Sequence, residues 1–235
     1  MKKTVIIFLS VLLLSVNGFA DFVISPKLGF ANIFTLETFS SERKSAKDVI
    51  STNSWNNLAI SLDMGFIGQS GLTLFFNNNI SLSGSIDKSI PSLDFNMKFK
   101  DLKGACWNGE LLLGYAFLKP KTQITLAGGI GAGAAYDMTV GKIEMKGKSI
   151  DIKDLLQVSI VDFGFALHIC ASLYFTENIG LAFSLTDTPG YGFYFAHLNK
   201  EKLGILGSLI DDDLLKGSGG LSNVFCLKLG PVFKF

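Results

Sequence analysis

Apolar and polar side chains alternate along most of the chain after its first twenty residues. In the clearest segment, Leu72, Leu74 and Phe76 are interleaved with Thr73, Phe75 and Asn77, and the alternation continues to position 84. A period of two is typical of a β-strand with one apolar face, and no helix-period segment of useful length is present. The pattern predicts eight strands, approximately at 22–36, 55–67, 71–84, 105–118, 123–140, 158–175, 179–195 and 221–235.

The connections between these strands alternate in length. Three are tight turns, at 68–70, 119–122 and 176–178. Four are long, at 37–54, 85–104, 141–157 and 196–220. Short turns on one side and long loops on the other are the habit of up-and-down transmembrane barrels. We therefore expect an all-β, antiparallel, eight-stranded up-and-down transmembrane β-barrel with short periplasmic turns and long extracellular loops. The even strand number would place both termini on the periplasmic side.

Composition separates this fold from two alternatives. Hydrophobic residues make up 48% of the chain and charged residues only 17%. A helical membrane protein would need an apolar run of about 18 residues in the mature part, and none is present. A soluble lipocalin-like barrel would carry a charged outer face. Here the polar positions of the strands are mostly Gly, Ala, Ser, Thr and Asn, which suit a narrow lumen better than a solvated surface.

Charge placement agrees with a membrane barrel. Of the 41 charged side chains, 27 lie in the four long connections. A charge facing lipid at mid-bilayer costs about 2–4 kcal/mol, whereas one in the lumen can be paired or hydrated. Five titratable residues of the strands share the lumen parity and should form a polar network near mid-height: Lys27, Asp63, Glu110, His168 and Lys228.

The first twenty residues are typical of a secretory signal peptide. Lys2 and Lys3 precede an apolar stretch, and Gly18-Phe19-Ala20 forms a small-residue cleavage site. We therefore expect a signal peptide at 1–20 and one mature domain at 21–235. An uncleaved membrane anchor is the alternative, but the apolar stretch is short for it. No Cys follows the predicted cut, so a lipoprotein is not expected.

The last strand carries the most specific signal. Leu227, Leu229, Phe233 and the terminal Phe235 alternate up to the chain end. Aromatic residues also gather near the strand ends, as girdles do at membrane interfaces. The expected periplasmic girdle comprises Phe22, Phe66, Tyr115, Phe117, Phe175, Phe233 and Phe235. The expected outer girdle includes Trp55, Trp107, Tyr136, Tyr191, Phe193 and Phe195.

With these features the chain resembles the small bacterial outer-membrane barrels typified by OmpW, OmpX and the OmpA transmembrane domain, with OmpW the preferred relative. The resemblance implies an outer-membrane location, surrounding lipid, and recognition of Leu229, Phe233 and Phe235 by the β-barrel assembly machinery. An OmpW-like protein implies a narrow conduit or binding site for small hydrophobic molecules. The alternative is a structural or surface-interaction barrel with a plugged lumen, whose extracellular loops meet ligands or host factors.

The seventh strand contains a candidate lateral opening at Asp187, Pro189 and Gly190. Asp187 falls on the lipid-facing parity, where a carboxylate is costly. Pro189 lacks the N–H that a central strand donates to its neighbour. We therefore expect a bulge or gap that turns Asp187 away from lipid. A gap would give an apolar molecule an exit into the membrane, while a bulge above the membrane would have no transport role.

Other kinds of function find little support in the sequence. The two histidines, His168 and His197, belong to no recognisable catalytic triad or metal-ligand spacing, so neither an enzyme nor a metal or cofactor is expected. The net charge of +1 and the absence of nucleic-acid-binding motifs argue against a nucleic-acid partner. Cys106, Cys170 and Cys226 are expected to be small apolar fillers rather than a disulfide framework.

Overall fold

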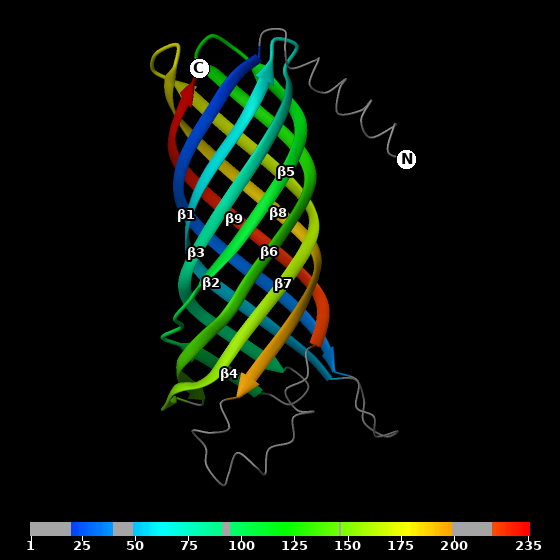
Figure 1. The fold of residues 1–235 in the computed structure, drawn as a ribbon, viewed down its shortest axis with the longest axis vertical. Helices are drawn as coiled ribbons and strands as arrows, with labels where there is room; N and C mark the ends of the chain where they lie inside the picture. The colour runs from blue at the N-terminus through cyan, green and yellow to red at the C-terminus, as the bar shows by residue number, and fades with distance from the viewer. Residues whose placement is uncertain (1–19, 40–48, 91–94, 146, 199–217) are drawn as a thin grey trace.

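The computed structural model describes residues 20–39, 49–90, 95–145, 147–198 and 218–235 as one ring of antiparallel strands (Figure 1). The strands are β1 (Ala20–Phe39), β2 (Val49–Gly68), β3 (Leu72–Ile90), β4 (Phe95–Lys100), β5 (Ala105–Leu118), β6 (Thr122–Met145), β7 (Lys148–Tyr174), β8 (Ile179–Leu198) and β9 (Ser218–Lys234). The predicted signal peptide lies outside the described residues, except for Ala20. Among the described residues, no helix has the length and apolarity to cross a bilayer.

Pairing of the first strand with the last closes the ring. Strand β1 pairs with β2 on one side and with β9 on the other. The sheet has nine strands in the described residues, where the sequence predicted eight. The additional strand arises because β4 and β5 pair with the same two neighbours, β3 and β6, at different heights. Residues 101–104 interrupt this position of the ring, and Asp101 there has a φ of 54°.

Both ends of the described chain and all three tight turns lie at one end of the barrel, here called the turn end. Phe22 and Phe235 exchange backbone hydrogen bonds of 3.0 and 2.8 Å. The turns 69–71, 119–121 and 175–178 connect β2 to β3, β5 to β6, and β7 to β8. At the opposite end, here called the loop end, several strands extend beyond the limits that the sequence predicts.

Much of what was predicted as long loops is strand. The predicted loop 141–157 is occupied by β6 and β7, which meet at residues 146–147, and much of 85–104 belongs to β3 and β4. The prediction was wrong there because these strands carry charged residues on the outside and apolar residues such as Phe99 and Ile143 on the inside, the reverse of the pattern in the lipid-facing wall. Ion pairs lie on this outer surface. Lys98–Asp87 at 3.1 Å and Lys100–Glu144 at 2.6 Å join neighbouring strands, and Lys142–Asp101 at 2.8 Å joins β6 to the segment between β4 and β5.

The wall of the barrel is apolar outside and mixed inside. Large apolar side chains such as Leu28, Ile130 and Phe165 are more than half exposed on the outer face. The inward positions form two apolar clusters. The turn-side cluster contains Val23, Ile67, Phe75, Leu112, Tyr174 and Val232, and the loop-side cluster contains Ile33, Trp55, Phe99, Met138, Ile160 and Val224, among others. Exposure of the apolar face identifies a membrane barrel rather than a soluble one.

Candidate functional site in the barrel lumen

A buried polar layer separates the two apolar clusters of the lumen. Along β1 the order of inward residues is Val23, Lys27 and Ile33, and along β9 it is Val232, Lys228 and Val224. In each strand a lysine therefore lies between a turn-side and a loop-side apolar residue. Alternation of side chains in a strand places all of them in the lumen. The buried polar residues of this layer are called the lumen network below.

Asp63 is the centre of the lumen network. Its Oδ2 lies 2.6 Å from Lys27 Nζ, and its Oδ1 lies 3.2 Å from Lys228 Nζ. All three side chains are at most 3% exposed. Removing charged groups from water costs several kcal/mol per ion, so such charges persist only when they are paired and hydrogen-bonded. One carboxylate shared by two ammonium groups meets that condition and joins β1, β2 and β9.

Polar neighbours accept further hydrogen bonds from the ammonium groups of the two lysines. Lys228 donates to Asn79 Oδ1 at 2.7 Å, and Asn79 in turn donates to Asn108 Oδ1 at 3.1 Å. Lys27 donates to Ser184 Oγ at 3.1 Å and approaches Cys170 Sγ at 3.8 Å. The network thus extends from the three strands around Asp63 to β3, β5, β7 and β8.

Glu110 and His168 belong to a second hydrogen-bonded group in the same layer. Asn77 donates to Glu110 Oε2 at 2.9 Å and lies 3.3 Å from His168 Nδ1. Nδ1 can accept from this amide when the ring proton is on Nε2. Thr186 Oγ1 lies 2.9 Å from the same Nδ1. Glu110 Oε1 is buried and has no hydrogen-bond partner among the described residues.

The structure brings all five sequence-predicted lumen residues into this layer, together with neutral polar residues that the sequence pattern did not single out. Asn77, Asn79, Asn108, Ser184 and Thr186 are all buried. Each occupies the inward parity of its strand, which was the available signal. Parity selects a face, whereas the partner of a side chain depends on register between strands that are far apart in sequence.

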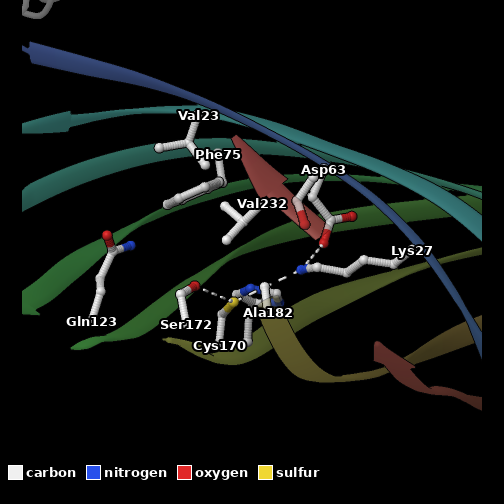
Figure 2. A pocket seen from close by; sticks show the side chains of 11 residues that line it. Val23, Lys27, Asp63, Phe75, Gln123, Cys170, Ser172, Ala182 and Val232 are labelled. Carbon is white, nitrogen blue, oxygen red and sulfur yellow. Dashed lines mark hydrogen bonds and ion pairs between the residues drawn. The ribbon is translucent and has the colours of Figure 1, made fainter. Parts of the chain in front are cut away.

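A small cavity adjoins the network on the turn side (Figure 2). Lys27 and Asp63 contribute its polar wall, and Figure 2 shows the Lys27 ammonium directed toward both Asp63 and Cys170. The cavity has a volume of about 10 Å³, which is roughly enough for one water molecule. Its other walls are Val23, Ser25, Phe75, Gln123, His168, Cys170, Ser172, Ala182 and Val232.

Of the bulge or gap predicted at Asp187, Pro189 and Gly190, the structure shows no bulge, but the ladder between β7 and β8 is interrupted there. Strand β8 is continuous, and its ladder with β9 is unbroken from Ile179 to Tyr194. The ladder with β7 lacks the two pairs opposite Thr188 and Pro189, but the register is the same before and after them. The missing N–H of Pro189 is thus accommodated by the loss of local pairing, without a shift of the strand.

Two features explain why the strand stays in register. Gly164 of β7 faces Gly190 of β8, and an added Cβ on Gly190 would lie 2.1 Å from the Phe163 carbonyl oxygen. Glycine therefore allows the two backbones to approach closely beside Pro189. Asp187 keeps its outward position, and Asn223 of β9 donates a hydrogen bond of 2.8 Å to its carboxylate. Asp187 is thus paired on the outer face rather than turned inward.

The remaining predicted residues are also placed by the structure. Leu229 and Phe235 of the C-terminal strand face outward and are well exposed, and Phe233 also faces outward but is partly buried. Trp55 does not belong to an outer girdle, because it points into the lumen and is 2% exposed. Cys106, Cys170 and Cys226 are buried free thiols. No group of three His, Cys, Asp or Glu in the described part of the chain is arranged to hold a metal ion.

Comparison with a solved structure supports the class of fold. The outer membrane protein OprG from Pseudomonas aeruginosa superposes with a TM-score of 0.54 at 12% identity, covering 92% of this chain and 96% of OprG. At this identity the likeness to OprG concerns the fold alone. The outer membrane protein AlkL gives a TM-score of 0.49 at 14% identity, covering 92% of this chain and 90% of AlkL. A major outer membrane protein from Thermus thermophilus gives 0.46 at 12% identity, covering 88% and 99%.

The closed antiparallel ring with its apolar outer wall has the fold of small outer-membrane β-barrels such as OprG. Within that class, the family model described as "Domain of unknown function (DUF2715)" matches residues 18–235, and the chain belongs to this family. No curated protein sequence matches it.

Proposed function

We propose that this outer-membrane barrel is closed by its own side chains and serves as an anchor that presents its loop end at the cell surface. In this arrangement the turn end, with both termini, faces the periplasm. Short periplasmic turns and longer extracellular connections are the general rule for bacterial barrels. Because β4 and β5 share one place, the ring is eight strands around, and a barrel of that size is narrow enough for side chains to fill the interior.

The observation that carries the proposal is the layered filling of the lumen. The ion-paired layer of Lys27, Asp63 and Lys228 lies between two apolar clusters, and each layer is buried. Lys228, Leu112 and Ile160 are each at most 1% exposed. A hydrated channel would leave its lining side chains accessible to water. The filled interior instead favours a barrel whose activity resides outside the membrane.

The loop end offers the surface for that activity. Strands β3, β4 and β6 continue beyond the apolar wall. They carry partly exposed ion pairs, including Asp87–Lys98 and Lys100–Glu144, so positive and negative charges are mixed on this surface. Mixed charge does not single out a polyanion or an anionic membrane as the partner. We therefore expect an extracellular or host ligand to be recognised by shape and mixed polar contacts at this end.

The proposal is tested by conductance across planar lipid bilayers. The refolded chain is expected to show no unitary current steps above those of the bare bilayer, because no layer of the lumen is open. Folding of the inserted protein is checked by its altered gel mobility before and after heating. Stable, stepwise conductance from the folded form would contradict a closed lumen.

A second candidate function is an OmpW-like conduit that releases small hydrophobic molecules sideways into the membrane. The two missing ladder pairs beside Pro189 are the observation that favours it. Replacing Pro189 with Val restores an N–H and should raise the free energy of unfolding by about 0.5–1.5 kcal/mol, the net contribution of one hydrogen bond. With a closed lumen, uptake of an apolar solute by cells producing the variant should remain unchanged. A drop in uptake would favour the conduit instead.

A further inference from the structure

An exposed apolar surface lies on the outside of the barrel beyond its middle, across β7, β8 and β9. It is called the aromatic face here and consists of Val161, Phe163, Tyr191, Phe193, Phe195 and Leu221, which are 40–63% exposed. Phe163 stacks on Phe193 with ring centroids 6.4 Å apart, and Tyr191 meets Phe193 edge-on at 5.2 Å. Strand pairing of Phe163 with Tyr191 and of Tyr191 with Leu221 makes the face continuous.

The aromatic face lies higher than a membrane band would reach. Strands tilted by about 35–45° gain roughly 2.5 Å of height per residue, so an apolar band about 25 Å tall spans about ten residues. Tyr191, Phe193 and Phe195 lie 12–16 residues beyond Ile179, where β8 leaves the turn end. The face therefore begins where the bilayer should end.

The outer surface at this height is polar on β2 and β3. Ser54 of β2 lies 14 residues from Gly68, and Asp87 of β3 lies 15 residues from Leu72. Asn32 of β1 donates to Ser54 Oγ at 2.8 Å and to Asn56 Oδ1 at 2.9 Å on this outer surface. These side chains fit an aqueous or headgroup environment. Phe34 of β1, which pairs with Ser54, is 41% exposed, so the more apolar flank comprises β7, β8, β9 and β1 and the more polar flank comprises β2 and β3.

Lipid is a poor cover for the aromatic face. The hydrogen-bonded pair of Asp187 and Asn223 lies below it on β8 and β9. If acyl chains covered β8 from Ile179 to Phe195, the apolar band would have to be about 40 Å tall at roughly 2.5 Å per residue, and Asp187 would lie at its middle, where a charge is most costly. With the bilayer ending near this pair, Asp187 is close to the headgroups and the aromatic face projects above them.

We propose that the aromatic face is the contact surface of a side-by-side dimer of this chain. The membrane fixes the height and the upright direction of every copy. A two-fold axis along the membrane normal therefore brings the aromatic face of one copy against the same face of the second at the same height. Such an isologous contact is the commonest arrangement in soluble homodimers. This inference does not depend on whether the lumen is closed.

The area of the face is sufficient for such a contact. A large aromatic side chain buries about 150–250 Å² when fully covered, so six side chains that are about half exposed offer roughly 500–600 Å². Two copies would then bury a little over about 1,000 Å² in total, the lower limit for a specific interface. Enrichment in Phe and Tyr and absence of charge are also typical of an interface core.

Energy transfer between labelled copies in lipid vesicles tests the dimer. Lys121, exposed at the turn end, is replaced with Cys and labelled with donor or acceptor dye, while the three native thiols remain buried. The copies are mixed in dioleoylphosphatidylcholine vesicles at high lipid excess. We expect transfer well above that of randomly placed monomers. Phe193→Lys should reduce it to the random level, and Ser54→Lys, on β2 outside the aromatic face, should leave it unchanged.

Four results would overturn the proposal. Transfer at the random level in the parent protein would show a monomer, and transfer that survives Phe193→Lys would place the contact elsewhere. A spin label at Phe193→Cys gives an independent reading through its collisions with oxygen and with a water-soluble nickel complex. The dimer predicts protection from both reagents. A label that collides freely with oxygen would show lipid cover, and one that collides freely with nickel would show an uncovered face.

Discussion

Replacing Asp63 with Ala is expected to lower the free energy of unfolding by about 3–5 kcal/mol, the cost of breaking a buried ion pair by removing one partner. The variant leaves both Lys27 and Lys228 buried without the carboxylate that they share at 2.6 and 3.2 Å. Their remaining partners, Ser184 and Asn79, are neutral. Urea unfolding in lipid vesicles measures the difference.

Two control variants separate burial of charge from other effects. Asp21 pairs with Lys234 at 3.4 Å near the turn end, where both side chains are partly exposed. Asp21→Ala should cost at most about 1 kcal/mol, as surface pairs do. Adding Lys27→Met and Lys228→Met to Asp63→Ala should recover most of the loss, since neither ammonium group is then left buried without its carboxylate. If Asp63→Ala costs no more than Asp21→Ala, the lumen network is hydrated rather than buried.

Truncation of Leu112 should have the second large effect, about 2–5 kcal/mol. Leu112 is 0% exposed and belongs to the turn-side cluster of the lumen. Its loss combines the transfer energy of the removed methyl groups with the cost of the space left behind. The neighbouring Leu111 on the same strand faces the membrane and is 49% exposed. Leu111→Ala removes the same atoms without leaving a cavity, because lipid can fill the space.

The comparison between the two leucines is therefore a test of packing in the lumen. We expect Leu112→Ala to destabilise the barrel more than Leu111→Ala when both are unfolded in urea from the same vesicles. Equal losses, or a larger loss at Leu111, would show that the turn-side part of the lumen is not tightly filled.

The membrane-spanning part of the fold could be predicted from sequence because lipid and lumen impose opposite chemistries on alternate residues. The strand 71–84 shows this clearly, and its register with β5 places Asn77 opposite Glu110. The strand ends beyond the membrane lack that signal. Lys98 and Lys100 face outward into water while Phe99 between them is buried, so the polar and apolar faces are exchanged relative to the lipid-facing strands. A search for strands with an apolar outer face therefore predicts loops where the structure has strands.

Two residues show where parity alone is insufficient. Trp55 lies near the end of a predicted strand, which suggests a girdle position. It alternates in step with Asn57 and Ala59, however, and therefore faces the lumen. The charge of Asp187 predicts an inward turn that the structure does not show. Its partner Asn223 comes from β9 and lies 36 residues away in sequence, and a contact of that kind depends on the register of the folded sheet.

The central claim is that the lumen is closed around Lys27 and Lys228, and the reactivity of these lysines tests it most directly. The folded protein in vesicles is treated with cyanate, a small water-soluble reagent, and each lysine is followed by mass spectrometry. Lys119 and Lys121, exposed at the turn end, report the rate of an accessible amine. A closed lumen predicts that Lys27 and Lys228 react at least about tenfold more slowly, because their side chains are at most 2% exposed. Carbamylation of Lys228 at the rate of Lys121 would contradict the closed barrel.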